Sequence, residues 1–228
     1  MSELKTILWD VGGPIVNEEL LLPKWEVALI EAATEATGTP IPRDTFDRVV
    51  REAVDSYAPF MFRTIMYRLV GEIDDLFEDG FRRFKEKMPT YSMTLQPGIY
   101  DLLKDLAKKL PMGVVANQDD GLVERLQELD VEDCFEIVLC PSDYGFYKPD
   151  TRAFLRVLEY LEVEPHDALM VGDRIDNDII PAKMLGMKTL LFRTGLLRNQ
   201  RLRTPDERPD WTVTRIDDMI SLLRDLVP

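Results

Sequence analysis

Short apolar runs of strand length recur along this chain, and patterns of helical spacing lie between most of them. The runs cover residues 5–10, 112–117, 136–140, 168–172 and 188–192, with a candidate edge strand at 211–214. Segments 122–129 and 154–161 repeat apolar residues at the spacing of amphipathic helices. Strands that alternate with helices predict an α/β fold whose parallel sheet is covered by helices.

The interval between the first two runs is too long for a single crossover connection. It spans about 100 residues and carries helical patterns of its own. These patterns start near Pro23, Phe46, Phe60 and Ile73. Gln96-Pro97-Gly98 then breaks the periodicity before the chain returns to the sheet. We therefore predict a core domain formed by residues 1–16 and 97–228, with an inserted helical domain at residues 17–96.

Composition narrows the classes of partner. The chain has 228 residues, of which 45% are hydrophobic, and this is enough to bury a large core. Its formal net charge of −14 disfavours nucleic acid and anionic membranes, which require basic surfaces, and favours a multivalent cation. We find no signal peptide and no apolar run long enough to span a bilayer, so we expect a cytoplasmic protein.

The cysteines and the single histidine do not indicate a site. Cys134 and Cys140 have a spacing that fits neither a zinc pattern nor a disulfide scaffold, so we predict two buried free thiols. His166 follows Pro165 in a predicted turn and is expected to face solvent. The chemistry of this chain is therefore expected to depend on carboxylates rather than on histidine.

Carboxylates follow two of the strand-like runs. Asp10 ends the first run, where a carboxylate beside a buried strand needs a cation or hydrogen bonds to compensate its charge. Such an aspartate is a candidate nucleophile for phosphoryl transfer, although taken alone it also fits a turn or capping residue. Asp173 and Asp178 follow the fourth run, where two oxygen donors can share an Mg²⁺ ion. Capping of the next helix is the alternative for Asp178.

Lys148 is the basic residue whose context indicates a role. Pro149 fixes the backbone beside it, so its ammonium group can be aimed into a site. A lysine among carboxylates would offset their charge and neutralise the oxygens of a transferring phosphoryl group. Taken alone, it equally fits a surface lysine before a helix. Because the carboxyl ends of parallel strands line one crevice, Asp10, Lys148 and Asp173 can converge on one metal and substrate.

The order and spacing of four segments resemble the haloacid dehalogenase-like superfamily of hydrolases. The segments are residues 7–16, 113–117, 148–150 and 171–178. The resemblance spans nearly the whole chain and implies a Rossmann-like core with a helical cap inserted between the first and second motifs. Most members are Mg²⁺-dependent phosphatases that act through a phosphoaspartate, so the resemblance also implies a small phosphorylated molecule as substrate.

The resemblance assigns roles to individual residues. It makes Asp10 the nucleophile and a metal ligand, and it makes Asp173 the second carboxylate ligand. Asp178 would lie beside the metal, and the backbone carbonyl of Gly12 would be the remaining protein ligand. Lys148 would contact both the nucleophile and the phosphoryl group.

Two positions depart from the motifs of that superfamily. Its phosphatases usually carry a second aspartate two residues after the nucleophile, where it protonates the leaving alcohol and later activates water; here that residue is Gly12. Loss of a general acid/base removes about 10² to 10⁴ in rate. The usual serine or threonine of the second motif is Ala116, and we expect Asn117 or Gln118 to bind the phosphoryl oxygens instead.

Three functions remain open at this point. The first is a Mg²⁺-dependent phosphatase in which water, Gln118 or a cap residue replaces the missing acid, with weak turnover where the leaving group needs a proton. The second is a metal-binding or partner-binding protein with little turnover, and the third is a dehalogenase in which Asp10 attacks carbon. Asp173 and Asp178 argue against the third, because an acidic cluster would repel an anionic haloacid. The sequence does not indicate the oligomeric state.

Overall fold

The chain divides into two units by the contacts between its residues. Residues 1–18 and 93–228 form the first, named here the sheet unit, and residues 19–92 form the second, the helical unit. The computed structural model describes residues 4–88, 93–118, 121–141 and 145–227. The unit boundaries in the structure lie within a few residues of positions 16 and 96, where the sequence pattern changes.

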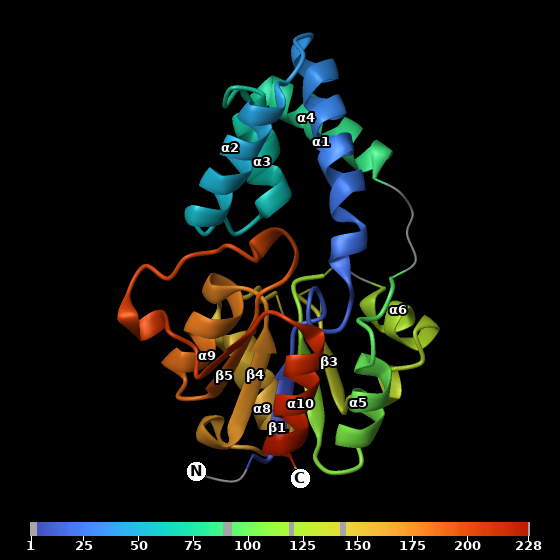
Figure 1. Ribbon diagram of the computed structural model, residues 1–228, viewed down its shortest axis with the longest axis vertical. Coiled ribbons are helices and arrows are strands. Elements are labelled where there is room, and N and C mark those ends of the chain that lie inside the picture. The colour runs from blue at the N-terminus through green and yellow to red at the C-terminus, as the bar shows by residue number, and fades with distance from the viewer. Residues whose placement is uncertain (1–3, 89–92, 119–120, 142–144, 228) are drawn as a thin grey trace. The chain divides into compact units, whose positions relative to one another are not determined.

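A parallel sheet forms the centre of the sheet unit (Figure 1). Among the described residues it has six strands, which are β1 (Thr6–Trp9), β2 (Met112–Val115), β3 (Ile137–Leu139), β4 (Ala168–Gly172), β5 (Lys188–Phe192) and β6 (Trp211–Val213). They lie in the order β3-β2-β1-β4-β5-β6, and every neighbouring pair is parallel. The predicted α/β fold is confirmed.

Helices cover both faces of this sheet (Figure 1). Their bounds are α5 (Ile99–Leu106), α6 (Leu122–Glu128), α8 (Thr151–Tyr160), α9 (Ile180–Met184) and α10 (Ile216–Leu226). Ile7 and Trp9 of β1 pack in a core with α5, α6 and α10, whereas Leu8 packs in a second core with α8 and α9. Burial on both faces explains why β1 is apolar at each of these positions.

The helical unit contains the helices predicted for the inserted segment. In its described residues these are α1 (Leu22–Thr37), α2 (Arg43–Asp55), α3 (Met61–Leu69) and α4 (Asp74–Lys87). Gly38 ends α1 with a left-handed φ of 67°, which a glycine adopts without steric cost. Aromatic rings join α1, α3 and α4, since Phe62 lies 5.1 Å from Trp25 and 5.4 Å from Phe84 between ring centroids. These rings form part of the core of the helical unit.

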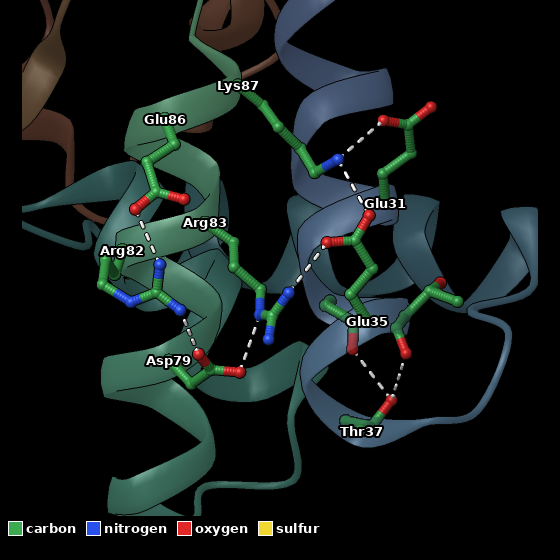
Figure 2. Close-up of polar contacts among 10 residues, drawn as sticks. Glu31, Glu35, Thr37, Asp79, Arg82, Arg83, Glu86 and Lys87 are labelled. Atoms are coloured by element: carbon green, nitrogen blue, oxygen red, sulfur yellow. Dashed lines mark hydrogen bonds and ion pairs between the residues drawn. The ribbon is translucent and has the colours of Figure 1, made fainter.

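A charged network on the surface also joins α1 to α4 (Figure 2). Glu35 on α1 accepts from Arg83 at 3.1 Å and from Lys87 at 2.9 Å, both on α4. Lys87 also donates to Glu31 at 3.3 Å, and Arg83 donates to Asp79 at 2.7 Å. Because these groups are exposed or only partly buried, we expect their ion pairs to contribute little to stability.

The cysteines do not form a disulfide. Cys134 and Cys140 are buried free thiols, as predicted. Across the part of the chain that the structure describes, no helix combines the length and apolar character needed to cross a bilayer.

Candidate active site

Three strand ends bring candidate residues to one edge of the sheet. Asp10 directly follows β1, Asp173 directly follows β4, and Asn117 lies just beyond the end of β2. Since β1 lies between β2 and β4 and all three run parallel, their carboxyl ends meet at the same edge. The chain order of the strands reverses next to β1, which is where doubly wound sheets bind ligands.

Three carboxylates form a buried cluster at this edge. Asp10, Asp173 and Asp178 each offer an oxygen within 4.8 Å of the others. Their exposed fractions are 7%, 6% and 0%. The structure therefore brings together residues that are more than 160 positions apart in the chain.

Lys148 is buried against this cluster. Its Nζ donates to Oδ1 of Asp10 at 2.6 Å and to Oδ1 of Asp178 at 2.7 Å. The side chain of Asn117 fixes the backbone of Lys148, accepting from its N–H at 2.7 Å and donating to its carbonyl at 2.9 Å. Lys148 is thus a site residue rather than a surface lysine, and Asn117 positions it.

Asp178 holds the loop that carries Asp173. Its Oδ2 accepts from the backbone N–H of Asp173 at 3.1 Å and of Arg174 at 2.9 Å. These N–H groups precede Asp178 in the chain, so the helix-capping alternative is wrong. A π-helical turn, η4 (Ile175–Ile179), folds Asp178 back onto the end of β4. Gly172 is required there, because a Cβ atom at this position would overlap the Asp178 carboxylate.

The carboxylates of the cluster carry more negative charge than Lys148 can balance. Burial raises the pKa of Asp173 well above its usual value, and the charges of Asp10 and Asp178 raise it further. Burial also raises the pKa of Asp178, although Lys148 opposes this increase. Burial disfavours the charged form of Lys148, but Asp10 and Asp178 outweigh that effect and raise its pKa. Lys148 is therefore charged, and the excess negative charge is what a divalent cation would compensate.

The donor set fits a hard divalent cation such as Mg²⁺. Carboxylate and carbonyl oxygens are the ligand type that this ion prefers. The parallel bridge between Gly12 and Val16 does not use the carbonyl of Gly12. In this bridge the N–H of Val16 donates to the carbonyl of Val11 at 2.9 Å, and the N–H of Gly13 donates to the carbonyl of Val16 at 3.0 Å.

Glu18 is a carboxylate of the site that the sequence patterns do not indicate. A Cβ atom built on Gly12 would lie 2.7 Å from Oε1 of Glu18. Burial raises the pKa of Glu18 to about 7, with a further increase from Asp10 and a decrease from Arg174. The signals that could have found it are the missing side chain at position 12 and the acidic residues that soon follow the first motif.

The side chain of Gln118 also lies beside Gly12. Its Nε2 is 3.5 Å from the position of a Cβ on Gly12. Its Oε1 is buried and, among the described residues, has no hydrogen-bond partner. Ala116 is buried and offers no side-chain polar group. The roles of Asn117 and Gln118 in phosphate binding stay predictions.

Gln200 supports the site from a segment without strands or long helices. It is 1% exposed, it accepts from the N–H of Ile175 at 2.7 Å, and it donates to Oδ1 of Asp176 at 2.7 Å. Asp176 in turn pairs with the guanidinium of Arg174. Gln200 therefore fixes the turn after β4, a role that no sequence pattern indicates.

Comparisons with known proteins identify relatives of this chain. Residues 4–186 match the family model of haloacid dehalogenase-like hydrolases. A protein of Pyrococcus furiosus named glyceraldehyde 3-phosphate phosphatase is 28% identical over 231 residues, which cover 98% of this chain and 94% of that protein. A protein of the same name from Methanocaldococcus jannaschii is 30% identical, with 98% of each chain covered.

The fold is also found among solved structures. A crystal structure of a predicted phosphoglycolate phosphatase from Haemophilus somnus superposes with a TM-score of 0.73 at 19% identity, covering 97% of this chain and 99% of that one. The family model spans most of the sequence, including Asp10, Lys148, Asp173 and Asp178. The chain therefore belongs to the haloacid dehalogenase-like hydrolases.

Proposed function

We propose that this protein is a Mg²⁺-dependent phosphatase that acts on a small phosphorylated metabolite through an aspartyl-phosphate on Asp10. The observation that supports it best is the buried cluster in which Lys148 bridges Asp10 and Asp178, with Asp173 beside them. Phosphoryl transfer requires a nucleophile, a positive charge held beside it and oxygen ligands for a metal ion, and this cluster offers all three.

Each residue of the cluster has a defined task in this proposal. Lys148 fixes the orientation of the Asp10 carboxylate and offsets the charge of the phosphoryl oxygens. Asp10, Asp173 and the Gly12 carbonyl would hold Mg²⁺, with Asp178 beside it. When bound, that ion neutralises charge on the transferring group. An oxygen of Asp10 attacks phosphorus while the bond to the leaving oxygen breaks, and water then releases phosphate and restores the carboxylate.

The names of the relatives suggest where to look for the substrate. Full-length relatives at 28% and 30% identity are named for glyceraldehyde 3-phosphate, and another at 26% is named for phosphoglycolate. We therefore propose a short phosphorylated carbon chain as the substrate class. Initial rates on glyceraldehyde 3-phosphate and phosphoglycolate would rank these candidates. Pyrophosphate is the comparison substrate outside this class, since a relative at 24% identity is named a pyrophosphatase.

Hydrolysis of p-nitrophenyl phosphate with and without Mg²⁺ tests the function itself. We expect activity that depends on Mg²⁺ and that falls by about 10³-fold or more in Asp10→Asn, because the nucleophile is lost. Asp101→Asn is the matched control, since Asp101 is an exposed aspartate on α5. It should leave the rate unchanged.

Other outcomes would favour the other functions that the sequence leaves open. Mg²⁺ binding by wild type without turnover on any phosphate would indicate a metal-binding or partner-binding protein. Release of halide from a haloacid without Mg²⁺, lost in Asp10→Asn, would indicate a dehalogenase. Activity that survives in Asp10→Asn would contradict a phosphoaspartate.

A further inference from the structure

The site needs a proton donor that the cluster around Lys148 does not supply. When Asp10 attacks a phosphate ester, the leaving alkoxide of a sugar or short-chain alcohol must take up a proton. Asp10 is occupied as the nucleophile, and the ammonium group of Lys148 is bonded to two carboxylates at 2.6 and 2.7 Å. Gln118 lies close by, but an amide does not transfer protons.

Glu18 occupies the space that the glycine after the nucleophile leaves empty. A Cβ atom on Gly12 would lie 2.7 Å from Oε1 and 3.2 Å from Cδ of Glu18. The carboxyl group of Glu18 therefore stands where the side chain of an acidic residue at position 12 would begin. Glu18 and Gly12 both belong to the sheet unit, so this proximity is a property of that unit alone.

The fold of the loop after β1 places Glu18 there. The N–H of Val16 donates to the carbonyl of Val11 at 2.9 Å, which turns the chain back on itself. Gln96 fastens the loop twice, because its Nε2 donates to the carbonyl of Gly13 at 2.8 Å and its N–H donates to that of Ile15 at 2.8 Å. These hydrogen bonds thus bring Glu18, which is six positions after Gly12 in the chain, back beside Gly12.

We propose that Glu18 is the proton donor to the leaving group and the acceptor of the proton from the hydrolytic water. In the first step an Asp10 oxygen bonds to phosphorus, the bond from phosphorus to the ester oxygen breaks, and that oxygen takes the proton of the Glu18 carboxyl. In the second step the oxygen of water bonds to phosphorus, its proton passes to the Glu18 carboxylate, and the bond from phosphorus to Asp10 breaks. This role rests on the proposed phosphatase function.

The Glu18→Gln variant tests this role with two substrates whose leaving groups differ in their need for a proton. With an alkyl phosphate, kcat/KM should fall about 10² to 10⁴-fold, because the leaving alcohol is no longer protonated. With p-nitrophenyl phosphate, kcat/KM should stay within about tenfold of wild type, since this leaving group needs no proton. Rapid mixing should then show a burst of p-nitrophenol close to one per enzyme, followed by slow turnover as the aspartyl-phosphate accumulates.

Glu19→Gln is the matched control, because it removes an exposed glutamate from the neighbouring position. It should behave as wild type with both substrates. Equal losses of kcat/KM on the two substrates in Glu18→Gln would overturn the role of Glu18, as would wild-type rates on both. A wild type without phosphatase activity would instead overturn the phosphatase function. So would phosphatase activity that survives in Asp10→Asn.

A second pair of variants removes the acid at position 18 and places an acid at position 12 instead. Glu18→Ala should lose activity on alkyl phosphates, and Gly12→Asp added to it should restore at least about tenfold, because the aspartate then occupies the vacated space. Failure of the double variant to restore turnover, with circular dichroism and the Mg²⁺-induced rise in melting temperature preserved, would overturn the proposal.

Discussion

Asp173 shows how a single residue links metal binding to stability. It is buried beside Asp10 and Asp178, and burial with these neighbours raises its pKa. A raised pKa in the folded state means that the protonated form is favoured by folding. Its contribution to stability is therefore present at low pH and is lost as pH rises through the folded pKa.

Asp173→Asn tests this effect by removing the charge while keeping the shape. In the metal-free protein, the stability of the variant relative to wild type should rise by about 1 kcal/mol or more between about pH 5 and about pH 7.5, because over this range the Asp173 carboxyl is ionised in the unfolded chain while burial still favours its protonated form in the folded chain. The variant should also lose the stabilisation by Mg²⁺ that wild type shows at the higher pH. Urea unfolding at both pH values, with and without Mg²⁺, measures both effects. A relative stability of the metal-free variant that does not rise between the two pH values would contradict this account.

The individual site residues differ in how far the sequence predicts them. Asp10 and Asp173 could be predicted because each directly follows an apolar run, and parallel strands bring such positions together. Lys148 could be predicted from its context, although the sequence alone did not place its ammonium group between two carboxylates. The sequence signals for Glu18 are weaker, namely the missing side chain at position 12 and the nearby acidic residues, because the place of Glu18 depends on the backbone hydrogen bonds of the loop before it. Gln200 was missed because it lies in a segment without periodicity.

Helix α4 shows which contacts stabilise an element of the helical unit. Its apolar side presents Phe84, which is 2% exposed and lies 5.4 Å from Phe62 and 5.9 Å from Phe81 between ring centroids. Its polar side presents Arg83, which pairs with Glu35 of α1 in a network open to solvent (Figure 2). The buried rings exclude water, whereas the ion pairs exchange one polar environment for another.

The two sides of α4 should respond very differently to truncation. Phe84→Ala should destabilise the fold by about 3–5 kcal/mol, because it leaves a cavity among aromatic rings. Arg83→Ala should have a much smaller effect that disappears as salt is added, because exposed ion pairs are screened. Urea unfolding followed by circular dichroism at low and high salt would compare them. A comparable loss in both variants would show that the surface network is a main source of stability.

The sequence predicts the strands and the long helices better than the short turns, because the turns depend on contacts with distant residues. The strands follow continuous apolar runs, and the helices of the helical unit follow apolar periodicity. Both signals can be seen in the local sequence. The π-helical turn η4 follows neither signal, because its shape is set by the contacts of Asp178 and Gln200 with the loop after β4. Residues 193–208, which lack periodicity, form 3-10 turns at Gly195–Leu197 and Pro205–Glu207 among irregular segments.

At the scale of the whole molecule, the net charge of −14 opposes the approach of an anionic substrate. Lys148 and a bound cation act at short range inside the site, whereas the surface charge acts over a Debye length. That length shortens from about 30 Å at 0.01 M salt to about 8 Å at 0.15 M.

We therefore expect kcat/KM for a phosphate ester to rise about twofold to tenfold between those salt concentrations, with Mg²⁺ kept saturating. The value of kcat should change little, because the distant charges act on encounter rather than on the bound complex. Steady-state rates in potassium chloride would measure both constants. A fall in kcat/KM with salt would mean that a local positive field, not the net charge, governs substrate approach.

The shared space of Gly12 and Glu18 also constrains how this sequence can diverge. An acidic side chain gained at position 12 would require the Glu18 carboxyl group to move from its present place, and shortening Glu18 alone would remove that carboxyl group. We therefore expect mutations at the two positions to be epistatic. Descendants of this protein should change them as a pair, and a long acidic side chain at one should rarely coexist with an acidic side chain at the other.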